Sequence, residues 1–153
     1  MRLRRSLVYV GLAFAILSIS VPAMAGDLLL SRTDVNDLTR SNIGKPFWSL
    51  QAQCAGAFGA AYAFEQGHGK AKRAEEDKAT GVSMLDDSLA RLQIDRGLDR
   101  AQALDVALPE VEFGRQTGKA MLDKQGDASD SSWNWLRSVC LDVASAAHNH
   151  LGS

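Results

Sequence analysis

The amino-acid sequence predicts an all-α fold, a four-helix bundle-like domain with one disulfide, preceded by a cleaved secretory signal peptide. In several separate stretches, apolar residues recur three and four positions apart, the spacing of one helical face. No run of alternating polarity and no Asn-Gly or Asp-Gly turn points to a strand or a hairpin. The only two cysteines, Cys54 and Cys140, fall within the first and last of the long helical stretches.

Residues 1–25 have the three parts of a secretory signal peptide. Three arginines precede an uncharged run of about 15 residues, and Ala-Met-Ala then stands before Gly26, so cleavage is expected between Ala25 and Gly26. An uncleaved membrane anchor is the alternative, but a spanning helix needs about 20 apolar residues. The short arginine-rich start is typical of bacteria, so general secretion to a periplasm or to the exterior is expected.

Removal of these 25 residues changes the composition of the chain. The remaining 128 residues hold 53 apolar residues, and 14 Lys and Arg (17 minus three) stand against 18 Asp and Glu, a net charge of −4. This composition excludes a multidomain enzyme, a basic nucleic-acid-binding domain and a low-complexity disordered chain. Because 18 of the 53 apolar residues are alanine, we expect helices that approach closely through Ala and Gly.

The first long helix is expected over residues 46–66, at the start of a helical domain that covers residues 46–151. A loose N-terminal arm, residues 26–45, precedes it, with a short helix over residues 33–39. Pro46 suits a first helical position, because the N–H that proline lacks would have no hydrogen-bond partner there in any case. No charge occurs between Lys45 and Glu65, so most of this helix should be buried. A membrane span is the alternative for so uncharged a segment, and its glutamines argue against that alternative.

Two further helical regions follow, over residues 70–96 and 98–125. The first half of the former is nearly all polar and should be solvated, and Gly97 should end it. Its second half carries a predicted core stripe, namely Val82, Leu85, Leu89 and Leu92. The other region should bury one side made of Leu98, Ala101, Leu104 and Leu108. Pro109 predicts a kink or a restart there, and Gly114 and Gly118 weaken the helix beyond it.

The last helix is expected over residues 131–150. Its apolar positions follow a regular spacing of three and four, namely Trp133, Leu136, Cys140, Val143 and Ala147. Trp133 and Trp135 are two positions apart, so one can face the core while the other lies near its edge. An even number of cysteines in an exported domain predicts a Cys54–Cys140 disulfide that joins the first helix to the last. A redox-active pair is the weaker interpretation, because no C-x-x-C motif is present.

The sequence lacks the motifs of several chemistries. Glu65 and His68 match half of a di-iron carboxylate motif, but no second copy exists and Gly67 should end the helix there. His148 and His150 lie two positions apart near the end of a helix, so their side chains diverge. No nucleophile motif, dinucleotide-binding loop or covalent haem motif occurs. We therefore expect neither an enzyme nor a bound cofactor or metal.

Two functions remain as expectations. The first is a non-enzymatic periplasmic or secreted protein that binds a protein partner in the envelope or outside the cell, with no nucleic acid and no stable membrane span after cleavage. The alternative is a carrier of a small ligand or metal that uses a pocket between helices. The candidate pocket residues share large aromatic or imidazole side chains, and they are Trp48, Phe58, Tyr62, His68 and Trp135.

Overall fold

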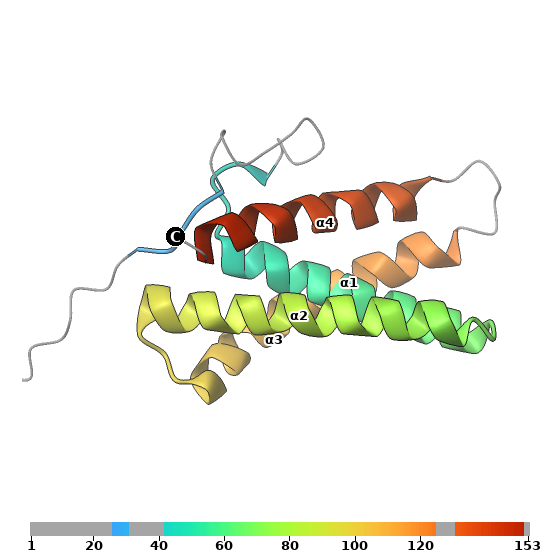
Figure 1. The fold of residues 1–153 in the computed structure, drawn as a ribbon, viewed down its shortest axis with the longest axis horizontal. Helices are drawn as coiled ribbons and strands as arrows, with labels where there is room; N and C mark the ends of the chain where they lie inside the picture. Colours follow the sequence, from blue (N-terminus) through green and yellow to red (C-terminus); the bar gives the residue numbers. More distant parts are fainter. Residues whose placement is uncertain (1–25, 31–41, 125–130, 152–153) are drawn as a thin grey trace, which may run out of the picture.

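The computed structural model describes residues 26–30, 42–124 and 131–151. These residues form four α-helices and no strand (Figure 1), which confirms the all-helical prediction. The helices are α1 (Phe47–Gly67), α2 (Ala71–Arg96), α3 (Arg100–Asp123) and α4 (Ser132–Leu151). The predicted signal peptide, residues 1–25, and the predicted short helix, residues 33–39, lie outside the described residues.

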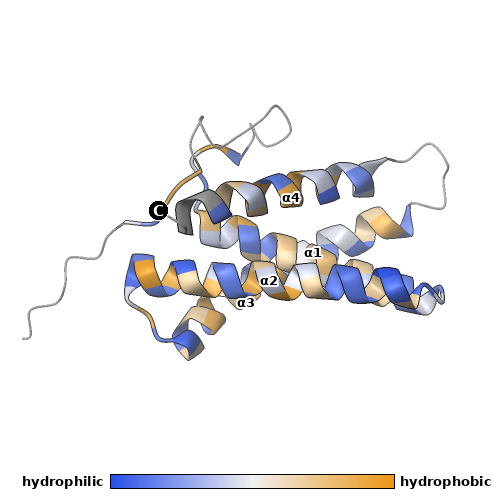
Figure 2. Cartoon of the chain, in the orientation of Figure 1, coloured by the Kyte–Doolittle hydropathy of each residue, from blue (hydrophilic) through white to orange (hydrophobic). Residues whose placement is uncertain are grey.

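Helix α1 lies at the centre of the molecule and packs against each of the other three helices. Figure 1 shows α4 above α1 and α2 below it, while α3 starts at the lower left, passes behind α2 and ends at the right between α2 and α4. Thirteen of the 21 residues of α1 are buried, as the absence of charge in this segment predicts. The polar first half of α2, in contrast, is the most hydrophilic stretch of helix in Figure 2. In the described part of the chain, no helix is both long enough and apolar enough to cross a membrane.

Helices α1 and α3 approach each other backbone to backbone. A methyl group built on Gly56 would lie 1.9 Å from the carbonyl oxygen of Val111, and one on Gly114 would lie 1.8 Å from that of Gln53. The buried residues of α3 are accordingly small ones and one leucine, namely Ala103, Ala107, Gly114, Gly118 and Leu122. At these two glycines there is room for a hydrogen atom between the helices but none for a methyl group.

This close approach overturns the expected buried side of α3. Leu104 and Leu108 are exposed, and the helix instead turns its alanines and glycines toward α1. Pro109 lies inside a helix that continues through it, so no restart occurs. Sequence spacing alone favours the leucines because burial of a large aliphatic side chain is worth about 1.5–3 kcal/mol. The leucines are nevertheless exposed, because large side chains at the interface would hold α3 away from α1.

Helix α2 buries its predicted stripe except at Val82, and Leu85 of that stripe is partly buried. Leu89 and Leu92 are buried as expected, whereas Val82 is exposed. The remaining buried positions carry small or polar residues and one methionine, namely Ala74, Asp77, Gly81, Met84, Ser88 and Asp95. The polar members of this face have partners, and Ser88, for example, donates a 2.7 Å hydrogen bond to the Trp48 carbonyl. Gly97 ends the helix with a φ of 65°, which confirms the predicted stop.

The first described residues are held against the helices rather than loose. Leu30 is buried beside Phe47 and Val143. Its backbone N–H donates to the Lys45 carbonyl at 2.9 Å, and the Phe47 N–H donates to the Leu28 carbonyl at 2.9 Å. Residues 28–30 therefore pair with the turn that leads into α1, and they fix the position of that turn.

Helix α4 is joined to α1 by the predicted disulfide. The Cα atoms of Cys54 and Cys140 are 5.4 Å apart and the bridge spans 86 positions of sequence. The predicted stripe of α4 faces the core: Trp133, Cys140, Val143 and Ala147 are buried and Leu136 is partly buried. Trp135 lies at the surface, so the two tryptophans divide between core and edge as their spacing predicts.

Candidate functional site

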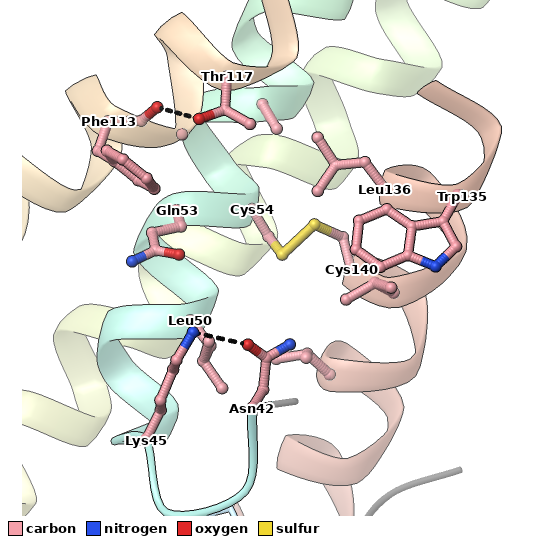
Figure 3. A pocket seen from close by; sticks show the side chains of 14 residues that line it. Asn42, Lys45, Leu50, Gln53, Cys54, Phe113, Thr117, Trp135, Leu136 and Cys140 are labelled. Carbon is pink, nitrogen blue, oxygen red and sulfur yellow. Dashed lines mark hydrogen bonds between the residues drawn. A yellow bond between two sulfur atoms is a disulfide. The ribbon is translucent and has the colours of Figure 1, made fainter. Parts of the chain in front are cut away.

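A cavity of about 250 Å³ opens between α3 and α4 above the middle of α1. We call it the α3–α4 groove (Figure 3). Helix α3 borders it with Phe113, Gly114 and Thr117, α4 borders it with Trp135 and Leu136, and the turn before α1 closes one end. The remaining lining residues come from α1 and α4, namely Leu50, Gln53, Cys54, Ala57, Val139, Cys140 and Val143.

The disulfide forms part of the cavity wall. Cys54 stands in the middle of α1 and Cys140 in the middle of α4, so their bond crosses the space that separates the two helices. Figure 3 shows the two sulfur atoms between the Gln53 side of the groove and the Trp135 ring. The bridge holds α4 against α1 and thereby sets the position of the α4 side of the groove.

Two large aromatic side chains flank the groove from opposite helices. Phe113 of α3 is 57% exposed and Trp135 of α4 is 45% exposed. Phe113 lies outward because its neighbour Gly114 occupies the position that faces α1. Exposed Trp and Phe beside a cavity are enriched at recognition surfaces, where they bury large areas when a partner binds. These two residues are the most conspicuous apolar groups around the groove.

Polar groups lie at the ends of the groove. The Lys45 ammonium donates a 2.9 Å hydrogen bond to Oδ1 of Asn42 at the end near the turn. Across the groove, the Thr117 hydroxyl donates to the Phe113 carbonyl at 2.9 Å. The Gln53 amide donates to Glu110 at 2.6 Å, which directs Glu110 to α1. Among the described residues that line the cavity, Lys45 is the only charged one.

The lining determines what the groove can do chemically. Its described residues include no carboxylate, imidazole or free thiol, the groups that most often transfer protons or attack substrates. No group of three or more His, Cys, Asp or Glu is placed to hold a metal ion in the described part of the chain. The groove is therefore arranged to hold an apolar group beside one cation.

The structure does not bring the five predicted pocket residues together. Trp135 lines the α3–α4 groove, and the other four do not. Phe58 is fully buried against Trp133, with ring centroids 6.0 Å apart. Tyr62 lies under the Lys78 ammonium, 5.6 Å from its ring centroid.

His68 is exposed at the end of α1, where its ring stacks on Phe64 at 4.1 Å. Glu65, in contrast, is buried and pairs with Lys70 at 3.1 Å and Arg73 at 3.5 Å. The half-motif formed by Glu65 and His68 is thus divided between an ion pair and the surface. Phe113 and Lys45 were not among the site residues predicted from the sequence. Phe113 could have been noticed because it is an aromatic residue in the mostly polar stretch VEFGRQTG.

The fourth aromatic, Trp48, belongs to a charged cluster at the end of α2. The Arg96 guanidinium lies 4.8 Å from the centroid of its ring and forms two hydrogen bonds to Asp27, at 2.8 and 2.7 Å. These bonds hold the pKa of Asp27 below its ordinary value of 3.8. The Leu28 N–H donates to Asp95 at 2.9 Å, so this cluster anchors the first described residues to α2.

A buried carboxylate links α2 to α4 beside the core. Asp77 is 2% exposed and its Oδ1 lies 3.6 Å from the guanidinium of Arg137. Burial raises the pKa of Asp77, and the nearby cations Arg137 and Arg73 oppose that rise. Arg137 also lies over the Phe58 ring, 5.9 Å from its centroid. These groups pair with each other and stabilise the packing of α4, so we assign them no role in binding.

A second cavity, of about 300 Å³, lies between the later halves of α1 and α3 over Gly59. Its two basic residues are already paired, Arg115 with Glu112 at 2.7 Å and Lys119 with Asp123 at 2.6 Å. Phe64 is the only aromatic side chain that lines it in the described part of the chain, and it is only partly exposed. The α3–α4 groove, with two exposed aromatics, is the better candidate site.

Comparison with known proteins yields no relative of this chain. No protein-family model matches it, and no curated protein and no solved structure matches it either.

Proposed function

We propose that this chain is an exported, non-enzymatic protein whose four-helix bundle-like domain binds a protein partner in the envelope or outside the cell. Export rests on the features of residues 1–25. The disulfide is compatible with it, since such bonds persist in oxidising compartments. The α3–α4 groove is the proposed contact site.

One observation carries this proposal. Phe113 and Trp135 come from different helices, and both are exposed beside the same cavity. The disulfide holds α4 against α1, and the glycine contacts hold α3 against α1, so both helices are fixed relative to α1. A rigid site of this kind loses little conformational entropy when a partner binds, which favours affinity.

Site-specific photo-crosslinking in the exporting cell tests the proposal. A benzoylphenylalanine is placed at Phe113 or, as a control, at Val82, an exposed apolar position on α2 that does not line the groove. We expect one dominant crosslinked partner from position 113, none from position 82, and loss of the product when Trp135→Ala is added. Equal crosslinking from both positions, or a product that Trp135→Ala leaves unchanged, would contradict the proposal.

The volume of the groove favours a second candidate, a small-ligand carrier. An engineered cavity of about 150 Å³ holds benzene, so a cavity of about 250 Å³ admits a somewhat larger apolar molecule. Native mass spectrometry after mild purification separates the two candidates. A carrier should show the mass of a bound small molecule, and Leu136→Trp should displace that molecule because the larger side chain fills the cavity. A partner-binding protein should show the bare mass of the chain.

A further inference from the structure

The dimensions of the α3–α4 groove limit what it can accept. Pockets for drug-sized ligands usually measure about 300–1,000 Å³, and this cavity measures about 250 Å³. One large aliphatic or aromatic side chain fits such a space. The remainder of the occupant would then lie along the exposed rims formed by Phe113 and Trp135.

The charge of the groove is uneven along its length. Lys45 stands at the end near the turn, and among the described residues no carboxylate pairs with its ammonium. At the Phe113 end the neighbouring carboxylates already have partners, since Glu110 accepts from Gln53 and Glu112 accepts from Arg115. Lysine has three N–H donors and the bond to Asn42 uses one. An occupant therefore meets the Lys45 ammonium at one end. At the other end it meets the Glu112–Arg115 ion pair and the Glu110 carboxylate, which keeps its negative charge because Gln53 is a neutral donor.

We propose that the occupant is an acidic segment of the partner protein, with one large apolar side chain against the Cys54–Cys140 bridge and a carboxylate at Lys45. The apolar side chain lies between Phe113 and Trp135. This inference rests on the proposed function, because it names the chemistry of the partner at that same groove. A small amphiphilic carboxylate shares the same chemistry, and the experiment below separates the two sources.

Peptide and lipid probes test the inference on isotope-labelled residues 26–153 with the disulfide formed. The probes are the blocked peptides Glu-Phe-Leu-Glu, Lys-Phe-Leu-Lys and Glu-Gly-Gly-Glu, together with sodium decanoate. We expect the acidic apolar peptide to shift the Trp135 indole N–H and the Lys45 amide at millimolar concentration. The lysine peptide should bind at least fivefold more weakly, and the glycine peptide and decanoate should shift neither signal.

Two charge variants sharpen the test. Lys45→Glu should weaken binding of the acidic peptide at least fivefold and strengthen binding of the lysine peptide. Lys72→Glu on α2 makes the same charge change away from the groove and should alter the binding of neither peptide. A one-dimensional spectrum checks that both variants remain folded. Equal binding of the acidic and basic peptides, binding of decanoate alone, or no binding of any probe would overturn the acidic-segment inference. The proposed function is judged separately, by the crosslinks from position 113.

Discussion

The carbonyl oxygen of Gln53 in α1 lies directly against the Cα of Gly114 in α3, with room for a hydrogen atom and none for a methyl group. Gly56 has the same relationship to the Val111 carbonyl, so the two backbones touch at two successive points. Contacts of this kind bring Cα–H groups to carbonyl oxygens, an interaction that recurs at helix–helix interfaces. The crossing also sets the position of Phe113, which immediately precedes Gly114 on α3.

Two glycines of α1, three positions apart, should respond oppositely to alanine. At Gly56 a methyl group would meet the Val111 carbonyl, so Gly56→Ala should lower the free energy of unfolding by about 3 kcal/mol or more. Nothing lies within 4 Å of a methyl group on Gly59, so Gly59→Ala should raise it by about 0.5–1 kcal/mol through helix propensity. Urea denaturation measures both. Equal effects of the two substitutions would show that the helices do not approach so closely.

The two tryptophans of α4 should differ as sharply. Trp133 is 2% exposed, so Trp133→Ala should cost about 3–5 kcal/mol of stability. Trp135 is 45% exposed, so Trp135→Ala should cost about 1 kcal/mol or less and leave the fold intact. Thermal and urea unfolding of the two variants check this pair. If Trp135→Ala unfolded the domain, the side chain would be part of the core and could not report on binding.

The disulfide should contribute a large share of the stability. It closes a loop of 86 positions, and in the chain-entropy model such a loop is worth about 4 kcal/mol. We therefore expect the double variant Cys54→Ala, Cys140→Ala to lose about 3–4 kcal/mol, as measured by urea denaturation. Intact mass with and without reduction and alkylation tests for the bridge directly. An unchanged urea midpoint in the double variant would mean that α4 is held by packing alone.

The Asp27–Arg96 pair should give stability a defined pH dependence. Because its hydrogen bonds place the folded-state pKa of Asp27 below 3.8, the stabilisation is complete above the unfolded-state pKa and is lost as the pH falls through the folded one. Asp27→Asn should therefore cost about 1 kcal/mol at pH 7. The difference from the natural protein should shrink as the pH falls below 3.8.

The matched control for this pair is Asp105→Asn, which changes an exposed carboxylate of α3 and should shift stability by less than about 0.5 kcal/mol. Unfolding in urea at pH 7, 5 and 3 compares the three proteins. A cost of Asp27→Asn that stays constant across this range would contradict the assignment, because a protonated Asp27 no longer attracts Arg96.

Regular spacing of large residues is the feature from which the fold can be predicted. In α4 the stripe from Trp133 to Ala147 faces the core, and in α1 the lack of charge predicts its central position. The cysteine positions predict the disulfide because both stand on core-facing sides of their helices. These signals are local, so they can be read from one segment of sequence at a time.

The face of α3 cannot be found in that way. Gly114 and Gly118 appear as helix-weakening residues until Gln53 and Ala57 of α1 are placed opposite them. The same limit affected the candidate site. Aromatic content selects Phe58, but only the packing shows that Phe58 fills the core while Phe113 borders the groove.

Oxidative footprinting of the domain bound to the partner identified from position 113 tests the central claim most directly. Hydroxyl radicals label exposed side chains, and mass spectrometry compares the free and bound proteins residue by residue. We expect strong protection of Trp135 and Phe113, with Trp133 weakly labelled in both states and Val82 unchanged, since Val82 lies on α2 away from the groove. Protection of Val82 and Ile94 with Trp135 still fully labelled would place the partner on α2 and contradict the account.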